Sequence, residues 1–209
     1  GTGISNGGAL RSVSGTNTYA GAIDLNAAAR INTDAGTLAI SGTVANDGFD
    51  LTVGGVANTT ISGVISGGGD LIKDDTGKLT VTNANTYGGA TTVSAGVLNV
   101  QDSAGLGATT GNTSVTSGAA LELQGGITIA VGEDLTISGT GISNGGALRS
   151  VSGTNTYAGA IDLDAAARIN TDAGTLEVSG NIDNDTFLLT VGGANNTTIS
   201  GIISDTGGL

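Results

Sequence analysis

The stretch Gly1-Thr2-Gly3-Ile4-Ser5-Asn6-Gly7-Gly8-Ala9-Leu10-Arg11-Ser12 returns unchanged further along the chain, at positions 139–150. The likeness continues beyond it, because residues 1–71 and 139–209 differ at only 14 of 71 aligned positions. A tandem repeat of this kind predicts a stacked architecture in which each unit contacts its neighbours along one axis. We expect residues 1–138 to form one full repeat unit and residues 139–209 to form the first half of the next, within one continuous solenoid.

Short apolar strands separated by glycine-rich turns fill the repeat unit. Each strand has the pattern Leu-x-(Val/Ile/Leu), in which side chains alternate between inside and outside with period two. Turn formers such as Asn6-Gly7-Gly8 and Asp75-Thr76-Gly77 lie between strands and tolerate a positive φ. Dividing the unit by these groups gives about six coils of about 23 residues, a typical length for a β-solenoid turn. The strands with this pattern are 38–40, 51–53, 79–81, 98–100, 121–123 and 135–137.

The composition indicates a thin but continuous core. The 209 residues include 39 Gly, 31 Thr and 17 Asn, and no Pro, Cys, Met, Trp or His. Aromatic residues make up 2%, which excludes a thick core, whereas 38% hydrophobic residues in alternating runs argue against disorder. We therefore expect an all-β, parallel β-helix (β-solenoid) of about nine rungs of about 23 residues.

Charge and residue types limit the chemistry. Without Cys and His, the chain cannot build disulfides or zinc, haem or copper sites of familiar type, and no cofactor is expected. The net charge is −12, and nucleic acid is not expected as a partner because a phosphate backbone requires clustered Lys and Arg. No membrane span is expected in this segment, and a start inside a repeat without Met suggests a piece of a longer chain.

A known family resembles the middle of the unit. Residues 67–98 contain a glycine cluster, an apolar strand, Leu79-Thr80-Val81, Asn85-Thr86-Tyr87-Gly88-Gly89, Thr91-Thr92-Val93 and a second glycine turn. This order resembles the autotransporter-associated β-strand repeat of large bacterial surface proteins, and residues 3–25 look like a companion motif of the same proteins. The resemblance implies a right-handed β-helical passenger that is exported and displayed at the bacterial cell surface, often as an adhesin or a spacer.

Two groups of charged residues are candidates for chemistry. Asp70, Asp74 and Asp75 fit either a solvated turn or a calcium site, although the calcium-binding pattern Gly-Gly-x-Gly-x-Asp is not matched. A polysaccharide lyase or hydrolase needs a base near acidic groups or two close carboxylates. Asp24 with Arg30 is the nearest such pair. Its duplication as Asp162 and Arg168 favours a surface ion pair over catalysis, so no catalytic, cofactor or metal residue is assigned.

Threonine pairs and tyrosines are candidates for binding. The pairs at 59–60, 91–92 and 197–198 suggest an ice-binding face, although Thr also favours ordinary strands. Tyr19, Tyr87 and Tyr157 suggest sugar stacking, although packing at a strand corner with a bonded hydroxyl is favoured.

The sequence thus predicts a non-enzymatic segment of an extracellular bacterial surface protein that acts as a stalk, adhesin or fibre. A polysaccharide-binding or polysaccharide-degrading β-helix and an ice-binding solenoid are the alternatives. Unpaired strand edges at the two ends predict self-association, end to end or side by side. A surface or carbohydrate ligand is the other expected partner.

Overall fold

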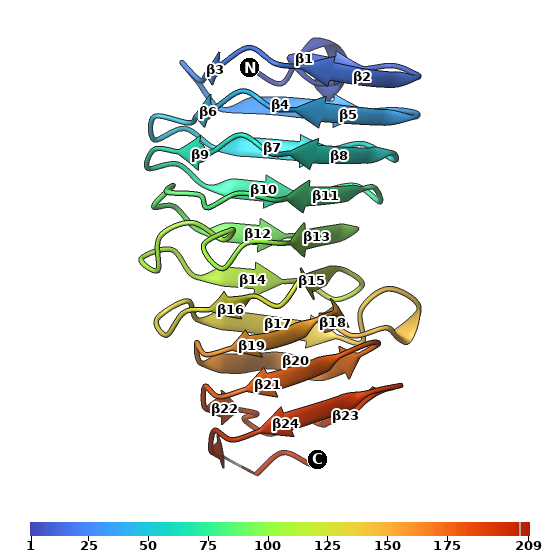
Figure 1. Cartoon of the computed structure of the whole chain (residues 1–209), viewed down its shortest axis with the longest axis vertical. Coiled ribbons are helices and arrows are strands. Elements are labelled where there is room, and N and C mark those ends of the chain that lie inside the picture. Colours follow the sequence, from blue (N-terminus) through green and yellow to red (C-terminus); the bar gives the residue numbers. More distant parts are fainter. Residues whose placement is uncertain (205) are drawn as a thin grey trace.

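A computed structural model describes residues 1–204 and 206–209. Its parallel strands are stacked in about nine turns that follow each other down one axis, from the amino end at the top of Figure 1 to the carboxyl end at the bottom. Every strand pairing among the described residues is parallel and joins one turn to the next. The expected all-β, right-handed parallel β-helix is therefore confirmed.

Each turn has three faces, which we number in chain order. Face 1 contains β1 (Leu10–Ser12), β4 (Ala29–Thr33), β7 (Leu51–Gly54), β10 (Leu71–Lys73), β12 (Thr91–Val93), β14 (Thr113–Val115), β17 (Leu135–Gly139), the first part of β20 (Ile161–Thr171), β22 (Ile182–Asp183) and β25 (Ile203–Ser204). Face 2 contains β2 (Thr16–Tyr19), β5 (Thr37–Ile40), β8 (Asn58–Ile61), β11 (Lys78–Val81), β13 (Val97–Val100), β15 (Ala120–Gln124), β18 (Leu148–Ser152), the last part of β20 and β23 (Leu189–Gly193). Face 3 contains β3 (Ile23–Asp24), β6 (Val44–Ala45), β9 (Ile65–Ser66), β16 (Thr128–Ile129), β19 (Thr154–Tyr157), β21 (Thr175–Val178) and β24 (Asn196–Ile199). Two 3-10 turns, η1 (Ile4–Asn6) and η2 (Ile142–Asn144), complete the elements.

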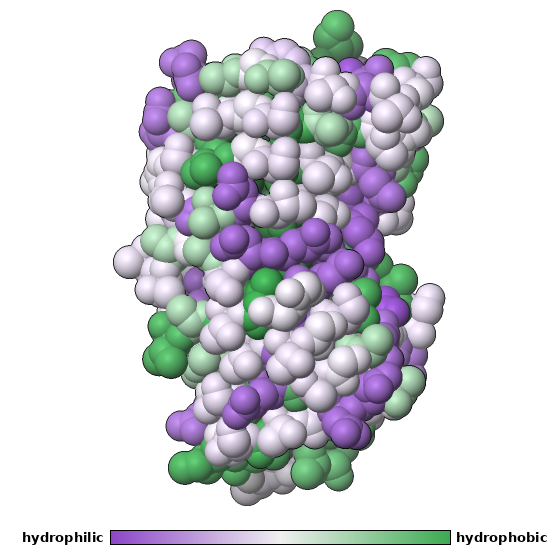
Figure 2. Space-filling view, in the orientation of Figure 1, coloured by the Kyte–Doolittle hydropathy of each residue, from purple (hydrophilic) through white to green (hydrophobic). Residues whose placement is uncertain are grey.

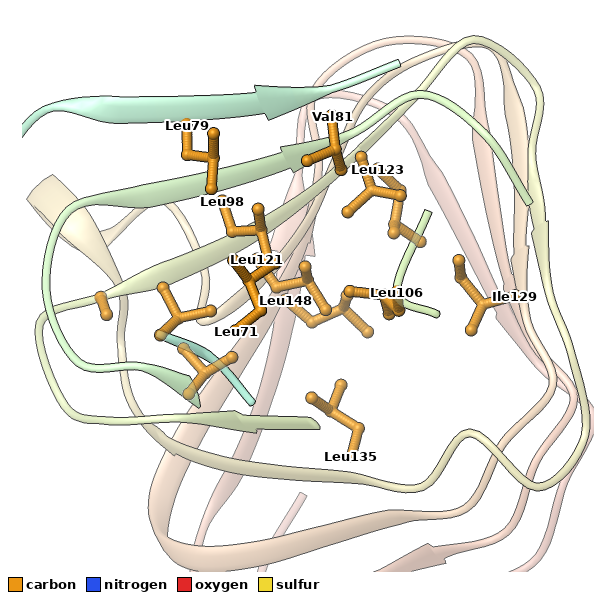
Figure 3. Close-up of a cluster of buried hydrophobic side chains, with 14 of the residues drawn as sticks. Leu71, Leu79, Val81, Leu98, Leu106, Leu121, Leu123, Ile129, Leu135 and Leu148 are labelled. Atoms are coloured by element: carbon orange, nitrogen blue, oxygen red, sulfur yellow. The ribbon is translucent and has the colours of Figure 1, made fainter. Parts of the chain in front are cut away.

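Stacked aliphatic side chains fill the interior. Figure 3 shows them pointing inward from three walls, with Leu79, Leu98, Leu121 and Leu148 along one wall and Leu135 on another. All five are almost fully buried. Burying one such side chain contributes about 1.5–3 kcal/mol, so a core only one side chain deep per wall is sufficient when it is repeated in every turn.

Glycines at one corner allow the turns to approach each other. A Cβ added to Gly42 would overlap the carbonyl oxygen of Gly21 in the preceding turn, and one added to Gly63 would overlap that of Gly42. The second copy repeats this arrangement at Gly159, Gly180 and Gly201. The glycine content is therefore a packing requirement at such corners as well as a turn requirement.

The turns are shorter than the sequence predicted, with equivalent strands about 21 residues apart. Most pairings join positions that differ by 20 to 22, as in Leu71 with Thr91 and Ile31 with Val53. The exceptions lie in the middle of the chain, where Glu122 pairs with Arg149 at a sequence separation of 27. The overestimate came from assigning six whole turns to residues 1–138, and the register shows that this repeat unit contains more than six turns.

The two copies of the repeat occupy different faces. β1 begins the face 1 ladder by pairing with β4, whereas its equivalent β18 pairs with β15 and β20 on face 2. In the same way β2 lies on face 2 and its equivalent β19 lies on face 3. Identical sequence is thus placed one face further round the solenoid in the second copy.

Candidate functional site

The most organised polar group on face 1 is a cluster that joins two adjacent turns. Register pairing places Arg11 beside Asn32. Arg11 Nε donates to Asp34 Oδ2 at 2.7 Å, and Asn32 Nδ2 donates to Asp34 Oδ1 at 2.6 Å. Arg30 Nη2 donates to Asn32 Oδ1 at 3.0 Å. We call Arg11, Arg30, Asn32 and Asp34 the first cluster, in which Arg30, Asn32 and Asp34 follow one another along one turn and Arg11 comes from the turn before.

Two carboxylates complete the first cluster from later turns. Arg30 is buried, and its Nη1 donates to Asp74 Oδ2 at 2.5 Å while its Nη2 contacts Asp75. The hydrogen bond from Arg30 to Asp74 raises the pKa of the guanidinium further above its usual value, so Arg30 stays charged. A buried charge requires such paired partners.

Lys73 lies beside this ion pair but inside the solenoid, in the ladder between Val53 and Val93. Its Nζ donates to the carbonyl oxygens of Asp75 at 2.8 Å and Ala95 at 3.1 Å. Burial lowers the pKa of Lys73 to about 8, and the nearby carboxylates oppose that shift. Lys73 therefore ties the ends of two successive turns together through backbone carbonyls.

The second copy rebuilds the cluster on face 2. Arg149 Nε donates to Asp172 Oδ2 at 2.7 Å, Asn170 Nδ2 to Asp172 Oδ1 at 2.8 Å, and Arg168 Nη2 to Asn170 Oδ1 at 3.0 Å. We call Arg149, Arg168, Asn170 and Asp172 the second cluster. Its three distances agree with those of the first cluster to within 0.2 Å, so the geometry is a property of the repeated sequence and does not depend on the face.

A carboxylate from the first repeat extends the second cluster. Glu122 is nearly buried and accepts from Lys78 Nζ at 2.7 Å and from Arg149 Nη1 at 3.3 Å. Asn99 and Gln124 join the same group through Asn99 Nδ2, which donates to Glu122 Oε2 and to Gln124 Oε1. Figure 2 shows hydrophilic residues gathered in a band across the middle of this side of the molecule, at the level of β13 and β15.

The three aspartates that suggested a calcium site have other partners. Asp74 and Asp75 are paired with Arg30, and Asp75 Oδ2 also accepts from Gly55 N at 3.0 Å. Asp70 Oδ1 accepts from Ala90 N at 2.8 Å in the next turn. A calcium ion at Asp74 and Asp75 would have to displace a buried guanidinium. In the described part of the chain, no group of three His, Cys, Asp or Glu side chains is placed to hold a metal ion.

The expected surface ion pair between Asp24 and Arg30 was wrong. Asp24 belongs to β3 on face 3, whereas Arg30 belongs to β4 on face 1, and Arg30 pairs with Asp74 and Asp75 instead. Asp162 and Arg168 are separated in the same way, since β20 bends from face 1 to face 2 between them. Closeness in sequence does not bring side chains together across a solenoid corner.

The threonine pairs divide between the inside and the outside. Thr59 and Thr91 are buried. Thr59 Oγ1 lies 2.8 Å from Thr33 Oγ1, and Thr171 Oγ1 lies 2.8 Å from Thr197 Oγ1 in the second copy. The outward row that contains Thr92 and Thr136 ends at Asp162 and Asp183, so the regular threonine surface that ice binding needs is interrupted.

Two of the three tyrosines have the favoured structural role. Tyr87 and Tyr157 are fully buried. The Tyr87 hydroxyl lies 2.7 Å from Thr91 Oγ1, and the Tyr157 hydroxyl donates to the Glu133 carbonyl oxygen at 2.9 Å. Tyr19 is 40% exposed in the first turn.

Sequence reasoning missed a buried acid, Glu133. Its side chain is 2% exposed, and Oε1 accepts from Thr113 Oγ1 at 2.7 Å while Oε2 has no partner. It borders a cavity of about 90 Å³ that Leu106 and Ile129 also line. Burial raises the pKa of Glu133 to about 7, and the Thr113 hydrogen bond opposes that shift. A single Glu in a Gly-Glu-Asp turn gives no signal in the sequence that it points inward.

An acidic groove of about 440 Å³ lies on face 1 near the carboxyl end, lined by Asp134, Asp162 and Asp183 among others. Asp162 and Asp183 are register partners in neighbouring turns. Partial burial, followed by the charge of Asp183, raises the pKa of Asp162 above its usual value. The groove is therefore a place of uncompensated negative charge.

Comparison with known proteins agrees with this architecture. Residues 71–100 match the family described as the passenger-associated transport repeat. The chain is also 38% identical over 89 residues to the protein named adhesin BmaC autotransporter from Brucella suis biovar 1, an alignment that covers 43% of this chain. It covers 2% of that adhesin's length. No solved structure matches the chain.

These matches confirm the resemblance to the β-strand repeats of autotransporter passengers, and they support a segment of a surface protein. In the part of the chain that the structure describes, no helix is both long and apolar enough to cross a membrane.

Proposed function

We propose that this chain is a non-enzymatic stalk segment of an extracellular bacterial adhesin, and that it holds adhesive parts away from the cell surface. The observation that carries the proposal is the parallel ladder of face 1, which is unbroken from β1 to β25 through about nine turns. Backbone pairing in each turn depends only on its neighbours, so length is added without changing the cross-section. The likeness to part of an autotransporter adhesin supports the surface location.

The polar groups support a structural role. Arg30, Asp74 and Asp75 neutralise one another across turns, and Arg149 with Glu122 and Asp172 does the same on face 2. A lyase or hydrolase needs a base or a carboxylate pair that is free to reach the substrate. The charged groups of the clusters are instead used to tie one turn to the next.

Surface display provides the test of the stalk role. The chain is placed between a membrane anchor and an amino-terminal epitope, and the purified chain is separately offered to a panel of glycans and matrix proteins. We expect the epitope to be exposed to antibody and the purified chain to bind no panel member. Saturable binding of the chain itself would assign the adhesive role to this segment, and cleavage of acidic or neutral polysaccharides would make it an enzyme.

End-to-end association of the isolated chain is a second proposal. At the carboxyl end, Leu189, Val191, Ile199 and Ile203 line an open apolar groove of about 640 Å³. Strands β1 and β2 at the amino end have paired neighbours on one side only among the described residues. Such edges accept further parallel strands. A sedimentation coefficient that rises with concentration supports the proposal, and a constant monomeric value contradicts it.

A further inference from the structure

We infer that each successive copy of the 138-residue repeat is rotated by one face about the solenoid axis. Each copy therefore presents the same surface on a different side of the rod. The inference requires only the solenoid fold and does not depend on the stalk role. On face 1, six steps down the axis connect β1, β4, β7, β10, β12, β14 and β17. β18, the equivalent of β1, then follows β17 on the next face.

The repeat therefore equals six turns and one face, or six and one-third turns. The length of the connection explains why. Leu135 lies on face 1, and the connection from it to Leu148 is much shorter than a full turn, which takes about 21 residues. A connection of this length can reach face 2 but cannot return to face 1. Figure 3 shows the result, since Leu148 extends the wall of Leu121 while Leu135 points in from another wall.

The repeated sequence fits either face because its inward and outward positions stay the same. Leu148 is buried against Leu121 with the same alternation that Leu10 has against Ile31. The two clusters keep donor–acceptor distances of 2.7 Å between the first Arg and the Asp and of 3.0 Å between the second Arg and the Asn. Faces 1 and 2 are thus interchangeable for this sequence.

This rotation of one face per copy determines where a longer array presents its interaction surfaces. Three copies make 19 turns, and only the fourth copy returns to the face of the first. Neighbouring clusters are separated by about 30 Å along the axis, at about 4.8 Å per turn, and point to different sides. A partner that recognises one copy therefore leaves the next two copies accessible on the other sides. The array suits several partners bound around the rod rather than one extended partner along a single side.

Disulfide trapping in the full chain, which has no native Cys, tests on which face the second copy begins. Neighbouring parallel strands place their paired residues about 4.8 Å apart, within disulfide range. Ser114→Cys with Thr136→Cys is the positive control for face 1. Glu122→Cys with Arg149→Cys tests the proposed rotation by one face. Thr116→Cys with Arg149→Cys tests a repeat of six whole turns, because the face 1 register would then place Arg149 beside Thr116.

We expect the control and the Glu122–Arg149 pair to close on mild oxidation and the Thr116–Arg149 pair to stay reduced. The reverse result overturns the inference. Because Glu122 and Arg149 are paired with each other, Gln124→Cys with Ser152→Cys repeats the test without removing that ion pair.

A lengthened chain tests the display. Cys at the exposed turn residues Ser5 and Ser143, and at their equivalents in two further copies appended to the chain, is labelled with maleimide gold. We expect electron micrographs to show the first three labels on different sides of the rod. The fourth label should lie on the same side as the first, further along the axis. Labels in one straight row would overturn the inference.

Discussion

Replacing Glu133 by Gln is predicted to make the protein more stable at pH 8 and to change little at pH 5. The folded state raises the pKa of Glu133 from an ordinary 4.5 to about 7 because the carboxyl is buried, and the Thr113 hydrogen bond offsets only part of that shift. The folded state therefore holds this proton more tightly than the unfolded state does. The resulting stabilisation is fully present below about pH 4.5 and is lost as the pH rises through about 7.

The size of the effect follows from the shift. One pKa unit is worth about 1.4 kcal/mol, so the difference between 4.5 and about 7 corresponds to at most about 3.5 kcal/mol. Tyr87, Tyr157, Asp134 and Thr113 surround the carboxyl, and of these Asp134 is the acid exposed to water. Glutamine keeps the shape and the acceptor for Thr113 but carries no charge. The variant therefore lacks the pH-dependent contribution of residue 133 to the free energy of unfolding.

Urea unfolding followed by circular dichroism between pH 5 and 8 measures the difference. The unfolding free energy of the parent protein is expected to fall by about 2–3 kcal/mol relative to Glu133→Gln over this range. Asp134→Asn, at the neighbouring exposed acid, is the matched control and is expected to follow the parent. Parallel pH profiles for the parent and Glu133→Gln would refute the assignment of a buried, neutral carboxyl.

The repeat supplies its own controls for two further predictions. Arg30→Ala is expected to cost about 1–3 kcal/mol, since it leaves two part-buried carboxylates unpaired, whereas Arg168→Ala, whose described partner is Asn170, is expected to cost under about 1 kcal/mol. Thermal melts of both variants check this, and equal losses would show that the carboxylates do not depend on Arg30. Asp183→Ala, which restores the residue that the first copy has at Ala45, is expected to stabilise the protein by about 0.2–1 kcal/mol by removing a like charge beside its register partner in the acidic groove. The gain should shrink below pH 4, and a loss of stability at pH 7 would contradict the repulsion.

The sequence was sufficient for the fold because the relevant signals are local and repeated. The strands around Leu79, Leu98 and Leu121 could be predicted from alternation alone, and all three lie in the core. The turn length was overestimated because the 138-residue period was assumed to be a whole number of turns. Periodicity fixes the length of a repeat but not how many faces it covers.

The polar sites could not be predicted in the same way, because their partners are distant in sequence. Arg30 meets Asp74, 44 residues later, and Glu122 meets Lys78 across the same separation. Asp24 lies close to Arg30 in the sequence but is on another face. In a solenoid the relevant distance between side chains is counted in turns and faces, and these become known only with the register.

Small-angle X-ray scattering of the chain before and after insertion of one more 138-residue copy tests the central claim most directly. At about 4.8 Å per turn, six and one-third turns add about 30 Å to the length of the rod. A continuous solenoid predicts this increase with an unchanged cross-sectional radius. A wider cross-section, or the scattering of two compact bodies joined by a linker, would contradict a continuous solenoid.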